Sequence, residues 1–175
     1  SPPPTCADYG VIFLADNMIV TRACAAPVIS QQPIPATVCA SSPAGFHVAA
    51  SGSGSLAYQW TLDATPIDTI ANPRAATNLL LIASATQADA GLYRCVVTNT
   101  CGTATSDAAT LAVITTLLGD VSGDGFANGL DIQAFVNLLL TGGTPSAPYC
   151  AADLNHDGLA DVNDVPNFVA LLLGP

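Results

Sequence analysis

Hydrophobic and polar positions follow different patterns in three parts of this chain. Between residues 27 and 115, short apolar runs alternate with polar positions and are separated by clusters of glycine, proline and serine. This pattern predicts the short strands of a β-sandwich. From residue 116 onward, two apolar stretches have helical spacing and each follows an Asp/Gly-rich loop. The chain is therefore expected to be mainly β with a small C-terminal α module.

Residues 1–26 form the first part. The β-branched and apolar runs 9–14 and 18–21 flank the turn signal Ala15-Asp16-Asn17, which predicts a hairpin. Both faces of this hairpin are apolar, so something must cover it. It packs on its own downstream domain, or it donates a strand to another subunit, or it is the end of an upstream domain. We expect a Cys6–Cys24 disulfide to close its open end.

The expected strands of the central part include a Trp and a Tyr-x-Cys motif. Tyr58-Gln-Trp60 lies in one strand, and Asp89-x-Gly91-x-Tyr93-x-Cys95 opens another. The segment resembles immunoglobulin-like domains, in which such a Trp lies on strand C and such a Tyr forms the corner before strand F. The resemblance implies that the Tyr93 hydroxyl bonds to nearby backbone. The expected strands cover residues 46–50, 56–62, 78–82, 89–97 and 108–114.

Six cysteines in 175 residues favour disulfides and an oxidising, extracellular location. In the immunoglobulin resemblance, Val48 occupies the position that usually holds the partner of Cys95. Cys39 and Cys101 are then expected to pair with each other. Cys95 is expected to be a buried thiol or to pair with Cys150.

Two twelve-residue loops, 120–131 and 153–164, repeat one pattern of oxygen-bearing side chains. These stand at loop positions 1, 3, 5, 9 and 12, with glycine at position 6 and a backbone carbonyl expected at position 7. This is the spacing of a calcium loop, so the sequence predicts two bound Ca²⁺ ions. The candidate ligands are Asp120, Ser122, Asp124, Phe126, Asn128 and Asp131 in the first loop, and Asp153, Asn155, Asp157, Leu159, Asp161 and Asp164 in the second.

The two loops belong to an internal duplication. Asp131 matches Asp164 and Phe135 matches Phe168 at one constant offset, so each half is expected to bury its helix against the other. Residues 105–119 and 141–150 are expected to be non-helical. A calcium loop with only an exit helix, duplicated and carrying Asp at position 12, closely resembles dockerin domains. That resemblance implies calcium-dependent folding and binding to a cohesin module.

In that family, loop positions 10 and 11 often help to select the partner. They are Gly129 and Leu130 in the first loop, and Val162 and Asn163 in the second. The hydroxyl pair of well-known cellulosomal dockerins is absent from both. Together the two resemblances indicate a secreted bacterial protein with three parts: residues 1–26, 27–115 and 116–175.

The charge distribution excludes several classes of partner. All 13 acidic residues are Asp, only three residues are basic, and the formal net charge is −10. Such a chain is not expected to bind nucleic acid or anionic membranes, and no apolar run is long enough to span a membrane. There is no N-x-[ST] sequon, whereas the Ser/Thr/Pro stretches are compatible with O-linked glycan.

The residues indicate no catalytic site and no organic cofactor. His47 is expected on the outward side of a strand, and His156 at loop position 4 points away from a bound ion. The Asp residues outside the loops are scattered near turns and form no pair of the kind that glycosidases use. The chain is therefore expected not to be an enzyme.

Three functions are compatible with these patterns. The leading hypothesis is a non-catalytic extracellular protein that self-associates into a surface layer or filament, because an apolar N-terminal segment and an adhesive module stand at opposite ends of the chain. The first alternative is an anchoring region that attaches a secreted protein to a cohesin-bearing scaffold. The second alternative is a sandwich that binds carbohydrate or a cell surface.

Overall fold

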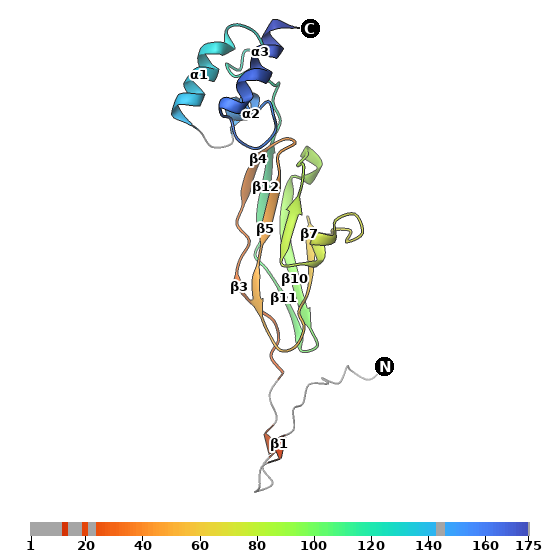
Figure 1. Ribbon diagram of the computed structural model, residues 1–175. Helices are drawn as coiled ribbons and strands as arrows, with labels where there is room; N and C mark the ends of the chain where they lie inside the picture. Colours follow the sequence, from red (N-terminus) through yellow and green to blue (C-terminus); the bar gives the residue numbers. More distant parts are fainter. Residues whose placement is uncertain (1–11, 14–18, 21–23, 143–145, 175) are drawn as a thin grey trace. The chain divides into compact units, whose positions relative to one another are not determined.

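The computed structural model describes residues 12–13, 19–20, 24–142 and 146–174. It is mainly β with short helices near the C-terminus, as the sequence predicts (Figure 1). The chain divides into two compact units. The first contains residues 1–34, 46–80 and 92–109, and the second contains residues 35–45, 81–91 and 110–175.

The strands are two to nine residues long. The first unit holds most of the strand residues, and four of the described strands have residues in both units. The strands are β3 (Val28–Gln31), β4 (Ala36–Cys39), β5 (Ala44–His47), β6 (Ala49–Ser51), β7 (Ala57–Leu62), β8 (Thr65–Pro66), β9 (Leu79–Ile82), β10 (Gly91–Asn99), β11 (Gly102–Thr105) and β12 (Ala109–Ile114).

The core of the first unit forms where β7 pairs antiparallel with β10. Cys95 stands opposite Trp60 in this register, and both side chains are fully buried. Phe46 stacks on Tyr93 with ring centroids 4.7 Å apart. The Trp60 indole N–H donates to the Thr77 carbonyl at 2.9 Å, which satisfies its buried polar atom. These residues give the sandwich the aromatic core that the immunoglobulin resemblance implies.

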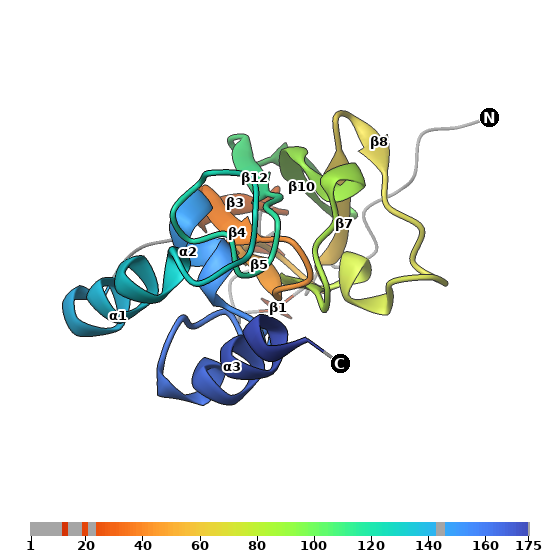
Figure 2. The same cartoon turned by 90° about the horizontal axis from the view of Figure 1, so that it is seen from above.

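The second unit contains the C-terminal helices together with part of the sandwich. In this unit β12 pairs with β4 in a parallel register, with Leu111 opposite Ala36 and Ile114 opposite Cys39. The three α-helices lie together (Figures 1 and 2). They are α1 (Asp131–Thr141), α2 (Ala147–Ala152) and α3 (Val165–Leu173). Short 3-10 turns occur at Pro73–Ala76, Gln87–Asp89 and Val162–Asp164.

The N-terminal hairpin forms where the sequence predicts it. Strand β1 (Ile12–Phe13) pairs antiparallel with β2 (Ile19–Val20), with Ile12 opposite Val20. The rest of the hairpin and Cys6 lie outside the described residues. That another part of the protein or another subunit covers its apolar faces stays a prediction.

The predicted disulfides are wrong. Cys24 bonds to Cys101 instead of Cys6, and Cys39 bonds to Cys150 instead of Cys101. The first pairing follows from Asn99, whose side-chain amide donates to the Ala25 carbonyl at 2.9 Å and so holds residue 25 beside the 99–102 turn. The second follows from burial, because Cys39 and Cys150 share one hydrophobic core. Cys95 is a free, buried thiol, which confirms one of its two predicted states.

Residues 141–150 also differ from the prediction of a non-helical connection. Helix α2 occupies residues 147–152 and leads directly into the second loop. Pro148 lies in its first turn, where the missing N–H costs little. Tyr149, Cys150 and Ala151 are buried, so tertiary packing and the disulfide stabilise a helix that its local composition does not suggest.

Candidate metal centre

The first loop is organised around two carboxylates. Both Asp120 oxygens accept backbone N–H bonds from the loop itself: Oδ1 from Gly123 at 2.8 Å and Asp124 at 3.0 Å, and Oδ2 from Gly125 at 2.9 Å. Asp131, the first residue of α1, is fully buried and accepts from the Ser122 N–H at 2.9 Å. The start of the helix is therefore tied to the loop.

The second loop repeats this arrangement. Asp164, immediately before α3, is fully buried and accepts the Leu154 and Asn155 N–H groups at 2.8 and 3.0 Å. Asp153 at position 1 accepts the Gly158 N–H at 3.1 Å. Gly125 and Gly158, at position 6 of the two loops, both have φ of 90°, a conformation that favours glycine. The predicted loop pattern therefore corresponds to one repeated backbone conformation.

The pKa values of Asp131 and Asp153 are shifted in opposite directions. Burial raises the pKa of Asp131, but N–H bonds from Asn128 and Ser122 outweigh it, so the net pKa is below its ordinary value. Burial, with the charges of Asp164 and Asp157, raises the pKa of Asp153. Asp153 is also the only buried position-1 carboxylate in the described loops, and its Oδ1 has no hydrogen-bond partner there. A bound cation satisfies such an atom and offsets the repulsion.

The donor set fits a hard cation, although the described side chains do not form a finished coordination shell. The candidate ligands are all oxygens from carboxylates, two amides, a hydroxyl and backbone carbonyls, which suits Ca²⁺. Within the described ranges, no three acidic, His or Cys side chains converge as they do around a metal. Asp124 and Asp157 at position 5 instead accept N–H bonds from Phe126 and Leu159, both at 2.9 Å.

Three further candidate ligands also accept hydrogen bonds from their own loops. Asn128 Oδ1 accepts the Leu130 N–H at 2.8 Å, and Asp161 Oδ1 accepts the Asn163 N–H at 2.7 Å. Asn155 Oδ1 accepts the Asp157 N–H at 2.9 Å. Side chains at positions 3 and 5 are exposed in both loops. Exposed hydrogen bonds contribute only modestly to net stability, so a cation could replace these local bonds at low cost.

The loops are coupled to one shared core. Phe135 of α1 and Phe168 of α3 stack with ring centroids 4.1 Å apart and an interplanar angle of 9°. Both rings are buried with Val121, Tyr149 and the Cys39–Cys150 disulfide. Each Phe lies one helical turn after the position-12 Asp of its own half. The predicted mutual burial of the two halves is confirmed.

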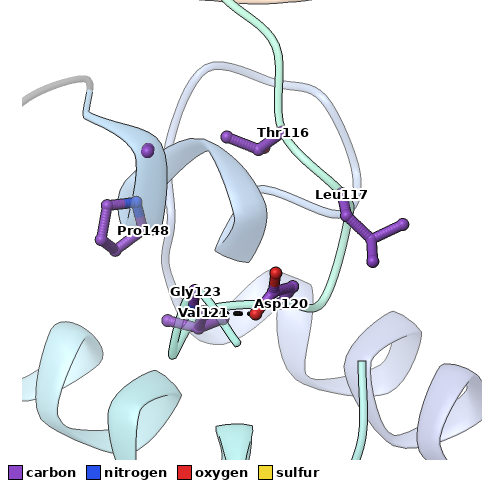
Figure 3. A pocket seen from close by; sticks show the side chains of 7 residues that line it. Thr116, Leu117, Asp120, Val121, Gly123 and Pro148 are labelled. Atoms are coloured by element: carbon purple, nitrogen blue, oxygen red, sulfur yellow. Dashed lines mark hydrogen bonds between the residues drawn. The ribbon is translucent and has the colours of Figure 1, made fainter. Parts of the chain in front are cut away.

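A cavity of about 190 Å³ adjoins the first loop. Figure 3 shows the Asp120 carboxylate and its bond to Gly123 beside apolar Leu117, Val121 and Pro148. The seven residues that line it include no His, Cys or Lys that could act as a base or nucleophile.

One participant was missed by sequence reasoning. The Ser42 hydroxyl, from the turn after β4, donates to Asp153 Oδ2 at 3.4 Å, and both residues are buried. These residues are 111 positions apart, and no local signal in the sequence connects them.

Two family models match separate parts of the chain. Residues 26–99 match the immunoglobulin domain, and residues 118–167 match the dockerin type I domain. An immunoglobulin-like domain is thus followed by a type I dockerin domain. Dockerin type I domains bind calcium and cohesin modules. Both domain types are non-catalytic, and their combination fits the anchoring hypothesis without giving specific support to a self-associating filament.

Several solved immunoglobulin structures are similar to part of the chain. "Tandem Ig repeats of Dlar" is 30% identical over 51% of this chain and 48% of that one, with a TM-score of 0.47, so the chain spans about half its length. A chimeric titin Z1Z2 is 28% identical over 54% of this chain and 99% of that one, with a TM-score of 0.46. No curated protein is significantly similar to the chain.

The described structure also bears on location. Two disulfides form within it, which is typical of proteins outside the reducing cytosol. None of the described helices is long and apolar enough to cross a membrane.

Proposed function

We propose that this chain is a non-catalytic, extracellular anchoring region whose dockerin domain, ordered by two Ca²⁺ ions, binds a cohesin-like module. The observation that carries the proposal is the duplicated loop–helix pair, which matches the dockerin type I model over residues 118–167. The immunoglobulin-like domain acts as a folded spacer between the anchor and whatever the chain carries. Localisation at the cell surface follows from attachment to a scaffold there.

Calcium would be held by the twelve predicted ligands, six in each loop. When bound, it supplies the positive charge that the clustered carboxylates need. Asp131 and Asp164 transmit loop order to the helices, because each is buried at a helix start and bonds to its own loop. The Phe135–Phe168 stack then holds the two helices together. Ion binding and the helix surface are thus coupled through the chain's own residues.

The two loop–helix repeats offer a duplicated apolar face. Four pairs of exposed hydrophobic side chains occupy equivalent positions in the two halves, and the last pair, Leu140 and Leu173, is equally exposed at 80%. Exposed apolar side chains in a repeated arrangement are typical of a protein-binding surface. The pairs are Phe126 with Leu159, Ile132 with Val165, Val136 with Val169, and Leu140 with Leu173.

The positions that select partners point to an apolar contact. Leu130 is 73% exposed and Val162 is 72% exposed. Neither can replace the hydroxyl pair of well-known cellulosomal dockerins as a hydrogen-bond donor. We therefore expect a cohesin-like partner whose surface is hydrophobic where it meets Leu130 and Val162.

Binding of the purified chain to a panel of immobilised cohesin modules tests the proposal. We expect at least one module to bind in 2 mM CaCl₂ (about 1,000 times a micromolar Kd) and to be released by EDTA. The double variant Leu140→Asp with Leu173→Asp is expected to weaken binding about 100-fold, because each change buries a charge.

The control is Ile70→Asp, which adds the same charge at a residue that is 90% exposed outside the dockerin domain. It is expected to leave cohesin binding unchanged. If a calcium-loaded, folded chain binds none of the modules, the anchoring proposal is wrong.

A further inference from the structure

The two calcium loops are equivalent in sequence but differ in what holds the position-1 carboxylate. Asp120 is half-buried, and its oxygens accept three N–H bonds, all from its own loop. Asp153 is fully buried, and its Oδ2 accepts the Gly158 N–H at 3.1 Å. The Ser42 hydroxyl supplies a second donor to the same oxygen at 3.4 Å.

We propose that Ser42 is a positioning residue of the second calcium loop, and that the Cys39–Cys150 disulfide delivers it there. The inference rests on calcium binding by the dockerin domain, which is part of the proposed function. It adds that a segment from the immunoglobulin-like domain completes one of the two sites. Loop 1 receives no such side chain in the described structure.

The turn that carries Ser42 is held from several directions within the second unit. Its backbone N–H donates to the Cys39 carbonyl at 3.2 Å, and its carbonyl accepts the Ala85 N–H at 2.9 Å. Ser41 donates to the Ala85 carbonyl at 2.7 Å, and Ala40 donates to the Ile114 carbonyl at 2.8 Å. Ser42 therefore reaches Asp153 from a fixed backbone, and the hydroxyl loses little freedom on bonding.

The disulfide fixes the opposite side of the contact. Cys150 lies in α2, three residues before Asp153, and Asp153 donates its own N–H to the Tyr149 carbonyl at 3.1 Å. Cys39 lies three residues before Ser42. The covalent bond thus holds the segment that carries Ser42 beside the segment that carries Asp153. A cavity of about 260 Å³, which Ser41, Cys39, Cys150 and His156 help to line, leaves room for loop 2 to move if this connection is broken.

The hydrogen bonds to Oδ2 leave the other oxygen ready for a cation. Asp153 Oδ1 is buried and has no partner in the described structure, whereas both oxygens of Asp120 are engaged. A buried carboxylate oxygen without a partner is costly, and a cation removes that cost. Partners of a ligating carboxylate typically change metal affinity by 10-fold or more when they are removed. We therefore expect loop 2 to depend on Ser42.

Calcium titration of the full-length chain, followed by ¹H–¹⁵N NMR, tests the inference. The Gly125 and Gly158 amides donate to Asp120 and Asp153, so each reports on its own loop in one sample. Ser42→Ala is expected to weaken loop 2 about 10-fold and to leave loop 1 unchanged. Ser146→Ala is the matched control. Ser146 lies in the same unit, and its side chain makes no hydrogen bond that caps α2.

A second variant, Cys39→Ser with Cys150→Ser, is expected to weaken loop 2 by at least as much, with loop 1 again as the internal reference. A merely structural disulfide would lower the melting temperature and leave the loop 2 affinity unchanged, which would overturn the delivery role. Equal calcium affinities in Ser42→Ala and the unmodified chain would overturn the role of Ser42. If neither the Gly125 nor the Gly158 amide signal responds to calcium, this inference and the calcium part of the proposed function are both overturned. Normal uptake without cohesin binding would contradict the anchoring proposal alone.

Discussion

Phe135 and Phe168 stack face to face although they come from different repeats of the sequence. Each follows the position-12 Asp of its own loop by one helical turn, so the contact joins equivalent points of the two repeats. Neither loop–helix unit can bury its Phe alone. The stack therefore makes the two halves a single cooperative folding unit.

Phe135→Ala is expected to destabilise the dockerin domain by about 3–5 kcal/mol, because it removes a buried ring and leaves a cavity beside Phe168. Chemical denaturation in calcium, followed by far-UV circular dichroism, measures this loss. Val136→Ala, at an exposed neighbour on the same helix, is the control and is expected to change stability by less than about 0.5 kcal/mol. Equal effects of the two substitutions would contradict the role of the stack.

Peptide mapping without reduction is expected to recover Cys24 linked to Cys101 and Cys39 linked to Cys150. The Cys39–Cys150 bond closes a loop with a sequence separation of 111 residues. Replacing both cysteines by serine should therefore cost about 2–5 kcal/mol of unfolding free energy. Recovery of Cys39 linked to Cys101 would contradict the described connectivity.

Cys95 is expected to resist alkylation in the native chain and to react fully in denaturant, because it is fully buried. Iodoacetamide labelling followed by mass spectrometry measures this difference. Rapid native labelling of Cys95 would show that the Trp60 core opens.

Burial also raises the pKa of Cys95 from 9.0 to about 11. The folded state then holds the thiol proton where the unfolded chain releases it. The unfolding free energy should therefore be constant below about pH 9 and fall as the pH rises toward 11. Cys95→Ala serves as the reference, since it lacks this part of the alkaline slope. Identical slopes in the two proteins, measured by urea denaturation between pH 8 and 11, would contradict the shift.

The dockerin repeat was predictable because residues close together in the sequence define each loop and its helix. Asp131, Phe135 and their counterparts in the second repeat follow fixed spacings that the calcium loop and helix impose on the sequence. Trp60 and Tyr93 identified the sandwich core for the same reason. The mutual burial of the repeats followed from their apolar spacing.

Contacts between distant segments were not predictable. Six cysteines allow fifteen complete pairings, and the immunoglobulin resemblance favoured the wrong partners for Cys39 and Cys101. Helix α2 was missed because Pro148 and nearby glycines mask a segment that burial stabilises. Ser42 gave no signal, since a lone serine in a turn is compatible with many environments. Its role depends on a backbone position that only the folded structure supplies.

Isothermal titration calorimetry with Ca²⁺ measures how many ions the chain binds. Titration of the calcium-free protein should give two bound ions per chain, and titration of the double variant Asp124→Ala with Asp157→Ala should give none. At free calcium about 1,000 times Kd, each site should add about 4 kcal/mol to the stability of the dockerin domain. Absence of calcium uptake by the unmodified chain, or two-ion uptake that persists in the double variant, would rule out calcium binding by these two loops.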